Sequence, residues 1–433
     1  MANLLELSKQ TYDYLMGKEG LKADFTLART EENEVTVKDG KMTMIRTLYN
    51  DAVSIRVIQN QKQGTASINS LVIQDIKEAI DSALASAEST DADPCYDIAP
   101  GLKPEKFEMG ALEPDMDKLL SRTMELSEMI AQRHPKIKLM EMYTKYVRGT
   151  NIYRNTNGTQ DEKEFGYYEL FLEYAGNDGV NSTGFQYNGV DFDSLDKPLI
   201  ELSSLEKDLT DTENSLNPIS ITEKFEGEII LTPSCASQML EMTIMNAAGD
   251  QAILGKTSMW LDKVGQKVAS DKLTIASNPW DPHFPNHEVH TGDGFRSEDY
   301  TLIEKGVLKS FATNLYTANK CGVARAANSS LAMVVEAGDV SLDDMIKGMK
   351  KGLIVGSVSC GMPGANGELS GVAKNSFYVE NGEVKGAVIE TMISLNLFDL
   401  CNNITAISKE RVCDGFMVMP SIQADHVTIS GKA

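Results

Sequence analysis

The sequence predicts an α+β fold of more than one domain, with antiparallel, hairpin-rich sheets and flanking helices. Asp-Gly and Asn-Gly pairs separate runs of β-forming residues, and such pairs favour hairpin turns because they accept positive φ. Helical apolar periodicity occurs between the hairpins, without the regular strand–helix alternation of a parallel sheet. The length of 433 residues is too great for one domain of about 150 residues.

The first expected domain covers residues 1–110. It opens with a helix whose apolar stripe runs from Leu4 to Leu15 and which stops near Gly17. A second helix is expected over residues 73–87, before a Pro-containing connector. Between the helices, strands are expected at residues 35–37, 42–45 and 52–58, with Asp39-Gly40 as the first turn.

The second expected domain covers residues 111–222 and ends in an acidic linker. A helix spanning Leu119 to Met129 begins it, and Asn157-Gly158 marks a hairpin turn. Strands are expected at residues 139–147, 151–155 and 165–174.

The third expected domain covers residues 223–433. Its first strand precedes Thr232, which is suited to cap a helix over residues 234–248. A later helix is expected over residues 341–351, capped by Ser341 and ended by Gly352. Hairpin turns are expected at residues 304–306 and 381–382.

The charge balance limits the possible partners. The chain has 41 Lys and Arg against 63 Asp and Glu, a formal net charge of −22. Nucleic acid and anionic membranes both need a basic face, so neither is expected as a partner. The chain shows no signal peptide, no apolar run of the ~20 residues that span a bilayer and no paired cysteines. A cytoplasmic protein is therefore expected.

Two glycine-containing segments of the sequence could form functional loops. Residues 249–257 resemble a phosphate loop, but five residues separate the glycines and a helix precedes them, so a helix end and turn is favoured. Residues 352–371 contain six glycines and surround Pro363. This segment could be a flexible loop over a cleft or an irregular surface loop.

Three of the five histidines lie close together at His283, His287 and His290. Imidazoles at such spacings could bind a metal ion. However, Pro282 and Pro285 prevent the helix that an HExxH zinc site requires. A polar, Pro-rich loop is favoured, and a metal site stays the alternative.

Glu241 lies in an otherwise apolar helix and has two possible roles. Packed against apolar side chains, its carboxylate would have a raised pKa and could act as a general base. It also shares a stripe with Ser234, Ser237 and Gln238, which could be the solvated side of the helix.

The C-terminal half carries a family resemblance. The segment from Gly371 to Glu390, with an Asn-Gly turn inside it, is followed by residues 391–404 and by an ending over residues 420–431. Together with residues 56–67 near the start, these segments resemble the TldD/PmbA family, also called modulators of DNA gyrase. The resemblance covers nearly the whole chain and implies a TldD/PmbA-like fold and a cytoplasmic metallopeptidase complex.

The resemblance also indicates a branch of the family. The TldD-like branch binds zinc through an HExxxH helix, whereas the PmbA (TldE) branch lacks those ligands. We align the TldD-like helix with this sequence at Gly249-Asp250. The first His, the Glu and the second His of HExxxH then correspond to Leu240, Glu241 and Met245. Leu has no lone pair and a thioether is a poor ligand for Zn²⁺. A PmbA-like chain without catalytic residues or bound cofactor is therefore expected, with zinc only in its partner.

The resemblance implies a subunit that joins a TldD-like metallopeptidase and presents a peptide substrate, and that forms a homodimer when isolated. Gly361, Gly364, Gly367 and His287 are the residues expected to face the substrate cleft. Two alternatives stay open. One is a homodimeric, non-enzymatic regulator of DNA gyrase or of a toxin–antitoxin system. The other is a peptidase whose metal site is the loop of His283, His287 and His290.

Overall fold

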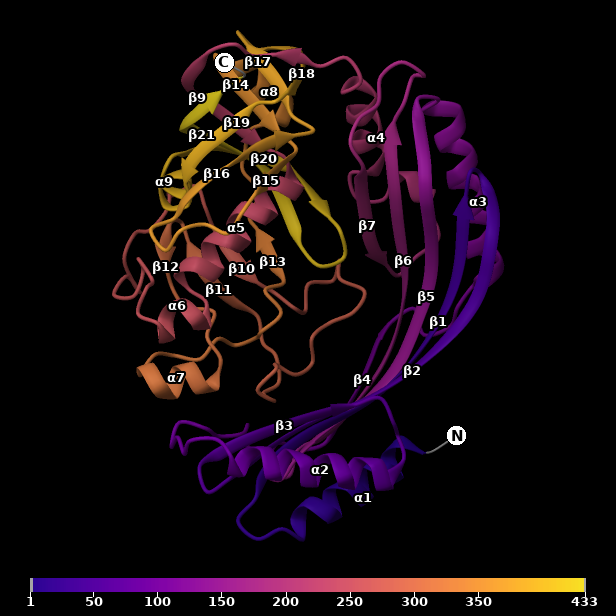
Figure 1. Cartoon of the computed structure of the whole chain (residues 1–433), viewed down its shortest axis with the longest axis vertical. Coiled ribbons are helices and arrows are strands. Elements are labelled where there is room, and N and C mark those ends of the chain that lie inside the picture. Colours follow the sequence, from indigo (N-terminus) through magenta and orange to yellow (C-terminus); the bar gives the residue numbers. More distant parts are fainter. Residues whose placement is uncertain (1–2, 432–433) are drawn as a thin grey trace.

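The computed structural model describes residues 3–431, and within them the strands form two sheets, one of seven strands and one of fourteen (Figure 1). Helices flank both sheets. The predicted α+β class is confirmed.

The first sheet has the order β3-β2-β1-β5-β6-β4, with β7 added to β6. All its neighbours are antiparallel except β4 and β6. Its strands are β1 (Lys22–Lys38), β2 (Lys41–Gln59), β3 (Lys62–Ile68), β4 (Glu105–Gly110), β5 (Ile137–Asn155), β6 (Gln160–Gly176) and β7 (Gln186–Phe192).

The turns of this sheet follow the sequence signals, but its strands are longer than expected. Asp39 and Gly40 both have positive φ, 48° and 71°, as a tight hairpin turn requires. β1 begins at Lys22 instead of residue 35, and β5 continues without a break from residue 137 to 155. Polar residues within both strands, such as Glu31 and Glu32 in β1 and Lys145 in β5, interrupt the apolar pattern and made these strands seem shorter in the sequence.

Two groups of helices cover the two ends of the long sheet (Figure 1). α1 (Leu4–Met16) and α2 (Ile73–Glu88) pack with Phe25 and Ile152 in one core. α3 (Met116–Arg133), the 3₁₀ turn η1 (Leu199–Glu201) and α4 (Leu205–Asn214) cover Tyr146 and Leu170 in another. Burial of these apolar side chains explains why each helix has one apolar stripe.

The boundary that we placed between residues 110 and 111 crosses this sheet. β1 pairs with β5 from Asp24↔Asn155 to Val37↔Met142, and β4 pairs with β6. Residues 1–110 and 111–222 therefore share one continuous sheet.

The second sheet is built from residues 219–430 around β21, which pairs with β9, β13, β19 and β20. Its strands are β8 (Ile219–Ser220), β9 (Lys224–Leu231), β10 (Ile275–Ser277), β11 (Tyr300–Glu304), β12 (Val307–Leu308), β13 (Met333–Val335), β14 (Lys351–Val355), β15 (Ser357–Cys360), β16 (Glu368–Lys374), β17 (Phe377–Glu380), β18 (Glu383–Ile389), β19 (Met392–Asn396), β20 (Ile404–Cys413) and β21 (Val418–Ser430). The helices of this part are α5 (Pro233–Ala247), α6 (Asp250–Leu254), α7 (Leu315–Cys321), α8 (Leu342–Gly348) and α9 (Leu397–Asn402).

The helix expected over residues 341–351 is shorter than predicted. Ser341 does cap α8, accepting from the Asp344 amide at 3.1 Å, but the helix ends at Gly348. Residues 351–355 instead form β14, between β9 and β17. Gly352 allows this close approach, because a Cβ there would lie 1.8 Å from the carbonyl oxygen of Glu228.

The glycine-containing segments also differ from their simplest interpretations. Within residues 352–371, only residues 361–367 form a longer loop, because the rest belongs to β14, β15 and β16 or, at Gly356, to the bend between β14 and β15. At Gly249 the chain does not enter a loop but starts the short helix α6. No strand precedes it, so a phosphate loop is absent from this segment. No helix within residues 3–431 combines the length and apolarity needed to cross a bilayer.

Candidate functional site

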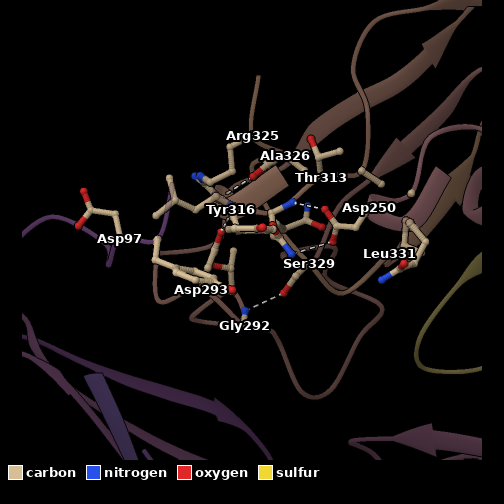
Figure 2. Close-up of a pocket in the computed structure, with 18 of the residues that line it drawn as sticks. Asp97, Asp250, Gly292, Asp293, Thr313, Tyr316, Arg325, Ala326, Ser329 and Leu331 are labelled. Atoms are coloured by element: carbon tan, nitrogen blue, oxygen red, sulfur yellow. Dashed lines mark hydrogen bonds between the residues drawn. The ribbon is translucent and has the colours of Figure 1, made fainter. Parts of the chain in front are cut away.

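A cavity of about 690 Å³ lies where the first sheet and its connector meet the second part of the chain. Arg56 of β2 and Tyr96 of the connector line one side of it. The other side comes from the end of α5, from α6 and from residues 291–293, 312–316 and 325–331. In Figure 2, Asp97 and Leu331 mark opposite ends, and Asp250, Asp293 and Tyr316 lie between them.

A buried ion pair holds the first-sheet wall. Both oxygens of Asp24 accept from Arg56 Nε at 3.2 Å, and Arg56 Nη2 also donates to Asp24. Burial raises the pKa of Asp24, and the Arg56 charge opposes that shift. Arg56 Nη2 donates a further bond to the carbonyl oxygen of Asp293, at 2.9 Å. One guanidinium therefore joins the two halves of the chain.

Asp293 orders the facing wall. Its side chain is buried and accepts from the backbone N–H of Leu315 at 2.6 Å and from the hydroxyl of Thr291. Asp250 orders the neighbouring residue Asn314. It accepts hydrogen bonds from both the backbone N–H and the side-chain amide of Asn314, each at 2.9 Å. These carboxylates position the start of α7, and each uses both of its oxygens in these bonds.

The connector is clamped against α7. Tyr96 stacks on Tyr316 with ring centroids 4.7 Å apart. Asp93 accepts from the Tyr316 hydroxyl at 3.0 Å and from Lys320 Nζ at 2.6 Å. The hydrogen bond from Lys320 lowers the pKa of Asp93 well below its ordinary range. The clamp thus closes one side of the cavity.

Arg325 is the cation available to a ligand in this cavity. Its guanidinium lies 3.8 Å from the ring centroid of Phe295. Among residues 3–431 it forms no ion pair, although it donates to the carbonyl oxygen of Ala326 at 2.5 Å. A guanidinium can bind a carboxylate through two parallel hydrogen bonds, so Arg325 suits an anionic or carbonyl-bearing ligand.

α5 reaches the cavity with its last turns. Thr232 caps it by accepting from the Cys235 amide at 3.4 Å, and Pro233 occupies the first turn, as the sequence predicted. Leu240 is 4% exposed and packs in the core of the second part, whereas Glu241 is exposed. Met245 is 49% exposed and lines the cavity. The apolar stripe of α5 is thus core, and Glu241 lies on the solvated side.

The structure places the glycines expected at a substrate cleft in the loop over residues 361–367. Gly364 accepts a hydrogen bond from the Asn246 side chain of α5, at 3.1 Å. Gly367 has a φ of +85°, and a Cβ there would lie 2.8 Å from Phe398. Neither these two residues nor Gly361 line the 690 Å³ cavity, so the loop lies along α5 outside it.

The three clustered histidines contact different partners. His283 Nδ1 lies 2.6 Å from Asp281, and His290 Nε2 lies 2.9 Å from Asp161. His287 Nδ1 lies 2.7 Å from the carbonyl oxygen of Pro279, so it must be the donor there. The structure does not bring these imidazoles together, and within residues 3–431 no three His, Cys, Asp or Glu could hold a metal ion.

Lys163 of β6 anchors the same loop. Its Nζ donates to Asn286 Oδ1 at 2.6 Å and to the carbonyl oxygen of His287 at 2.7 Å. Burial lowers its pKa to about 8. His287 stacks on Trp280 and does not line the cavity. The loop is thus a contact between the two sheets.

Two family models match the chain. The PmbA/TldA metallopeptidase domain 1 matches residues 23–87, and the PmbA/TldA metallopeptidase C-terminal domain matches residues 224–431. The chain belongs to the TldD/PmbA family.

Two PmbA relatives are similar to the chain along almost their whole length. A metalloprotease PmbA homolog of Haemophilus influenzae is 23% identical, over 96% of this chain and 94% of its own. Metalloprotease PmbA of Escherichia coli O157:H7 is 22% identical, over 95% and 92%. The crystal structure of TldE from Thermococcus kodakarensis covers 99% of this chain and 100% of its own, with a TM-score of 0.83 and 21% identity. A proposed modulator of DNA gyrase from Bacteroides thetaiotaomicron has a TM-score of 0.85 at 20% identity, covering 99% of each chain.

The residues of α5 do not fit the zinc ion of a TldD-like chain. Leu240 is buried in the core and offers no lone pair, and Met245 offers a thioether. Glu241 alone could contribute an oxygen. One carboxylate is not a zinc site, so no chemistry through a metal is derived for this TldD/PmbA chain.

Sequence reasoning missed most residues that line the cavity. Arg56 was noted only as part of the TldD/PmbA resemblance, and Asp293, Asn314 and Arg325 were not singled out. None of them belongs to a local sequence motif. Their common property is that the fold brings segments that are distant in the sequence together.

Proposed function

We propose that this chain is the non-catalytic subunit of a cytoplasmic TldD/PmbA-type metallopeptidase complex. It would join a zinc-bearing TldD-like subunit and help to hold the peptide that this partner cleaves. The chain itself would bind no metal.

The observation that carries this proposal is the composition of α5. The helix has the fold position that the resemblance assigns to metal ligands, yet it presents Leu240, Glu241 and Met245 there. Leu240 is part of the packed core, so no small rearrangement would expose a ligand at that position.

The cavity beside α5 supports a role in binding peptides. Its volume of about 690 Å³ falls within the ~300–1,000 Å³ of typical ligand pockets. Arg325 supplies a guanidinium that can bind peptide carbonyl or carboxylate groups, and Met245 supplies an apolar contact. Asp250 and Asp293 are already hydrogen-bonded and keep the walls in place.

A reconstitution experiment tests this proposal. Peptide cleavage is measured with this chain alone, with a TldD-like chain from the same genome alone, and with both. We expect cleavage to need the TldD-like chain and to increase at least several-fold in the pair. Cleavage by this chain alone, or no effect of adding it to its partner, would contradict the proposal. The second result would favour a regulator without proteolytic work.

One variant tests the role of the cavity in the pair. Arg325→Met should lower peptide cleavage mainly by raising KM, because the guanidinium would bind substrate rather than react with it. Arg133→Met on α3, whose charge pairs with Glu206 away from the cavity, is the matched control. Equal KM values for the two variants would show that Arg325 does not bind the substrate.

It stays a prediction that the loop over residues 361–367 and His287 face the substrate cleft. Deleting residues 361–368, which include Gly361, Gly364 and Gly367, should impair cleavage by the pair, and His287→Ala should weaken it less. Unchanged turnover after the deletion would exclude this loop from the cleft.

A further inference from the structure

Part of β2 forms a free edge of the first sheet. β1 pairs with β2 along its whole length, but β3 pairs only with residues Val53 to Gln59. On the outer side of residues 41–52, no strand within residues 3–431 pairs with the backbone. Such a row of unpaired N–H and C=O groups is a template for pairing with another strand.

The free segment also exposes large apolar side chains. Ile45 is 61% exposed and Tyr49 is 64% exposed, on the same face of the strand. Met44, on the opposite face, is 37% exposed, and Met42, which a bulge in the strand turns to the face of Ile45, is 46% exposed. Four such side chains along one unpaired strand are unusual for a surface that stays in water.

The polar side chains of the segment are already bound within the hairpin. Arg46 pairs with Glu34 at 2.9 Å, and Arg29 pairs with Asp51 at 2.7 Å. The Thr47 hydroxyl donates to Asn33 at 2.8 Å, and Asn50 donates to Glu32 at 3.0 Å. β1 thus neutralises the charges that would otherwise repel a second strand, and the segment contains no proline.

The free edge faces away from the rest of the molecule. In Figure 1, β1 and β2 run along the outer side of the first sheet, whereas the second sheet lies on the other side. The segment therefore cannot be covered by the second part of the same chain.

We propose that residues 42–52 of β2 pair antiparallel with the same residues of a second copy of this chain, about a two-fold axis at Thr47. This inference stands apart from the proposed function, because the edge is unpaired whatever the cavity binds. A two-fold axis brings the same strand of the second copy to this edge in antiparallel orientation, so both copies contribute the same surface to the interface.

The side chains favour the register centred on Thr47. In it, Ile45 of each copy lies opposite Tyr49 of the other, which creates two aromatic–aliphatic pairs. No two like charges are opposed. Centring the pair on Arg46 would place two guanidinium groups opposite each other, and centring it on Leu48 would place Ile45 opposite Asp51.

A cysteine scan tests the register in the full-length protein. The side chains of the two Thr47 residues face each other at the axis, so Thr47→Cys should form a disulfide-linked dimer when oxidised with glutathione disulfide. Met44→Cys is the matched control, because its counterpart across the axis is Asn50. Linkage in both variants to the same extent, or in neither, would overturn the proposed register.

Sedimentation equilibrium tests the interface. We expect the wild type to be dimeric and the double variant Ile45→Lys/Tyr49→Lys to dimerise at least about ten-fold more weakly, since four apolar side chains of the dimer become charged. Val180→Lys, at a side chain that is 90% exposed, controls for added charge. Circular dichroism should show that all variants are folded. A monomeric wild type at ~50 µM, or a double variant that dimerises as strongly as the control, would overturn the proposal.

Discussion

Two of the contacts between the first sheet and the second part of the chain have opposite electrostatics. At the cavity, Arg56 lies between Asp24 and the carbonyl oxygen of Asp293, so unlike charges meet. At the turn between β20 and β21, the backbone N–H of Asp191 in β7 donates to the carbonyl oxygen of Asp414, at 2.9 Å (Figure 1). Both residues of this second contact, Asp191 and Asp414, carry carboxylates, so like charges meet.

This difference indicates which contact stays fixed. Burial, with the nearby charges of Glu169 and Asp414, raises the pKa of Asp191 to about 7. That contact therefore changes charge near neutral pH, whereas Arg56 stays charged throughout. α5 spans the two places, with Ser237 near Asp414 and Met245 at the cavity. The cavity lies at the end held by Arg56, whose guanidinium keeps its charge over this pH range.

The largest effect is expected from breaking the cavity contact. Arg56→Met would leave Asp24 buried without its partner and remove the bond to Asp293. Loss of one partner of a buried pair costs about 3–5 kcal/mol. Urea unfolding of the variant should show a decrease of that size in the free energy of unfolding.

The exposed pair between Lys22 and Asp97, at 2.8 Å, is the control for this prediction. Lys22→Met should cost about 0–1 kcal/mol, because an exposed pair gains little over its hydrated ions. If both variants lost the same small amount, the cavity contact would not be the firmly held one.

The second contact should be sensitive to pH. Because the pKa of Asp191 is raised from an unfolded value of about 3.9 to about 7, its contribution is fully present below pH ~4 and is lost as the pH rises through ~7. Asp191→Asn should remove this dependence. The free energy of unfolding of the wild type, relative to the variant, should fall by up to roughly 4 kcal/mol between pH 4 and pH 8.

Asp193→Asn, on an exposed neighbour of the same segment, is the matched control. It should leave the pH profile of unfolding like that of the wild type. An Asp191→Asn variant with the wild-type profile would show that the two contacts do not differ in the way proposed.

α5 allows a finer comparison between a core position and a cavity position. Leu240→Ala should cost about 3 kcal/mol, as is usual for a buried leucine. Met245→Ala should change stability by about 0.5 kcal/mol or less, because the side chain is half exposed. Thermal unfolding measures both. Equal costs would mean that Met245 is a packing residue and that the cavity does not extend to α5.

Local signals predicted the elements that bury one face. The apolar stripes of α1, α2 and α5 and the turns at Asp39-Gly40 and Asn381-Gly382 lie where the sequence indicated. The lengths of β1 and β5 were not predicted, because polar residues within these strands interrupt the apolar pattern. The helix predicted over residues 341–351 was longer than α8, because no local signal shows that residues 351–355 pair with β9 and β17.

The site was less predictable than the fold. Glu241 stood out as a carboxylate in an apolar helix, but Leu240 and Met245 were found only through the family resemblance, since apolar residues in a helix carry no signal of an absent ligand. The cavity depends on contacts such as Arg56 with Asp293, which are separated by 237 residues. The histidine cluster gave a misleading signal, because nearness in sequence did not make the three side chains converge.

The most direct test of the central claim is the zinc content of each subunit after the complex is assembled with a TldD-like partner and then separated. The account predicts about one zinc ion in the partner and almost none in this chain, since Leu240 and Met245 cannot serve as ligands. Near-stoichiometric zinc in this chain, lost in a His287→Ala variant, would contradict it.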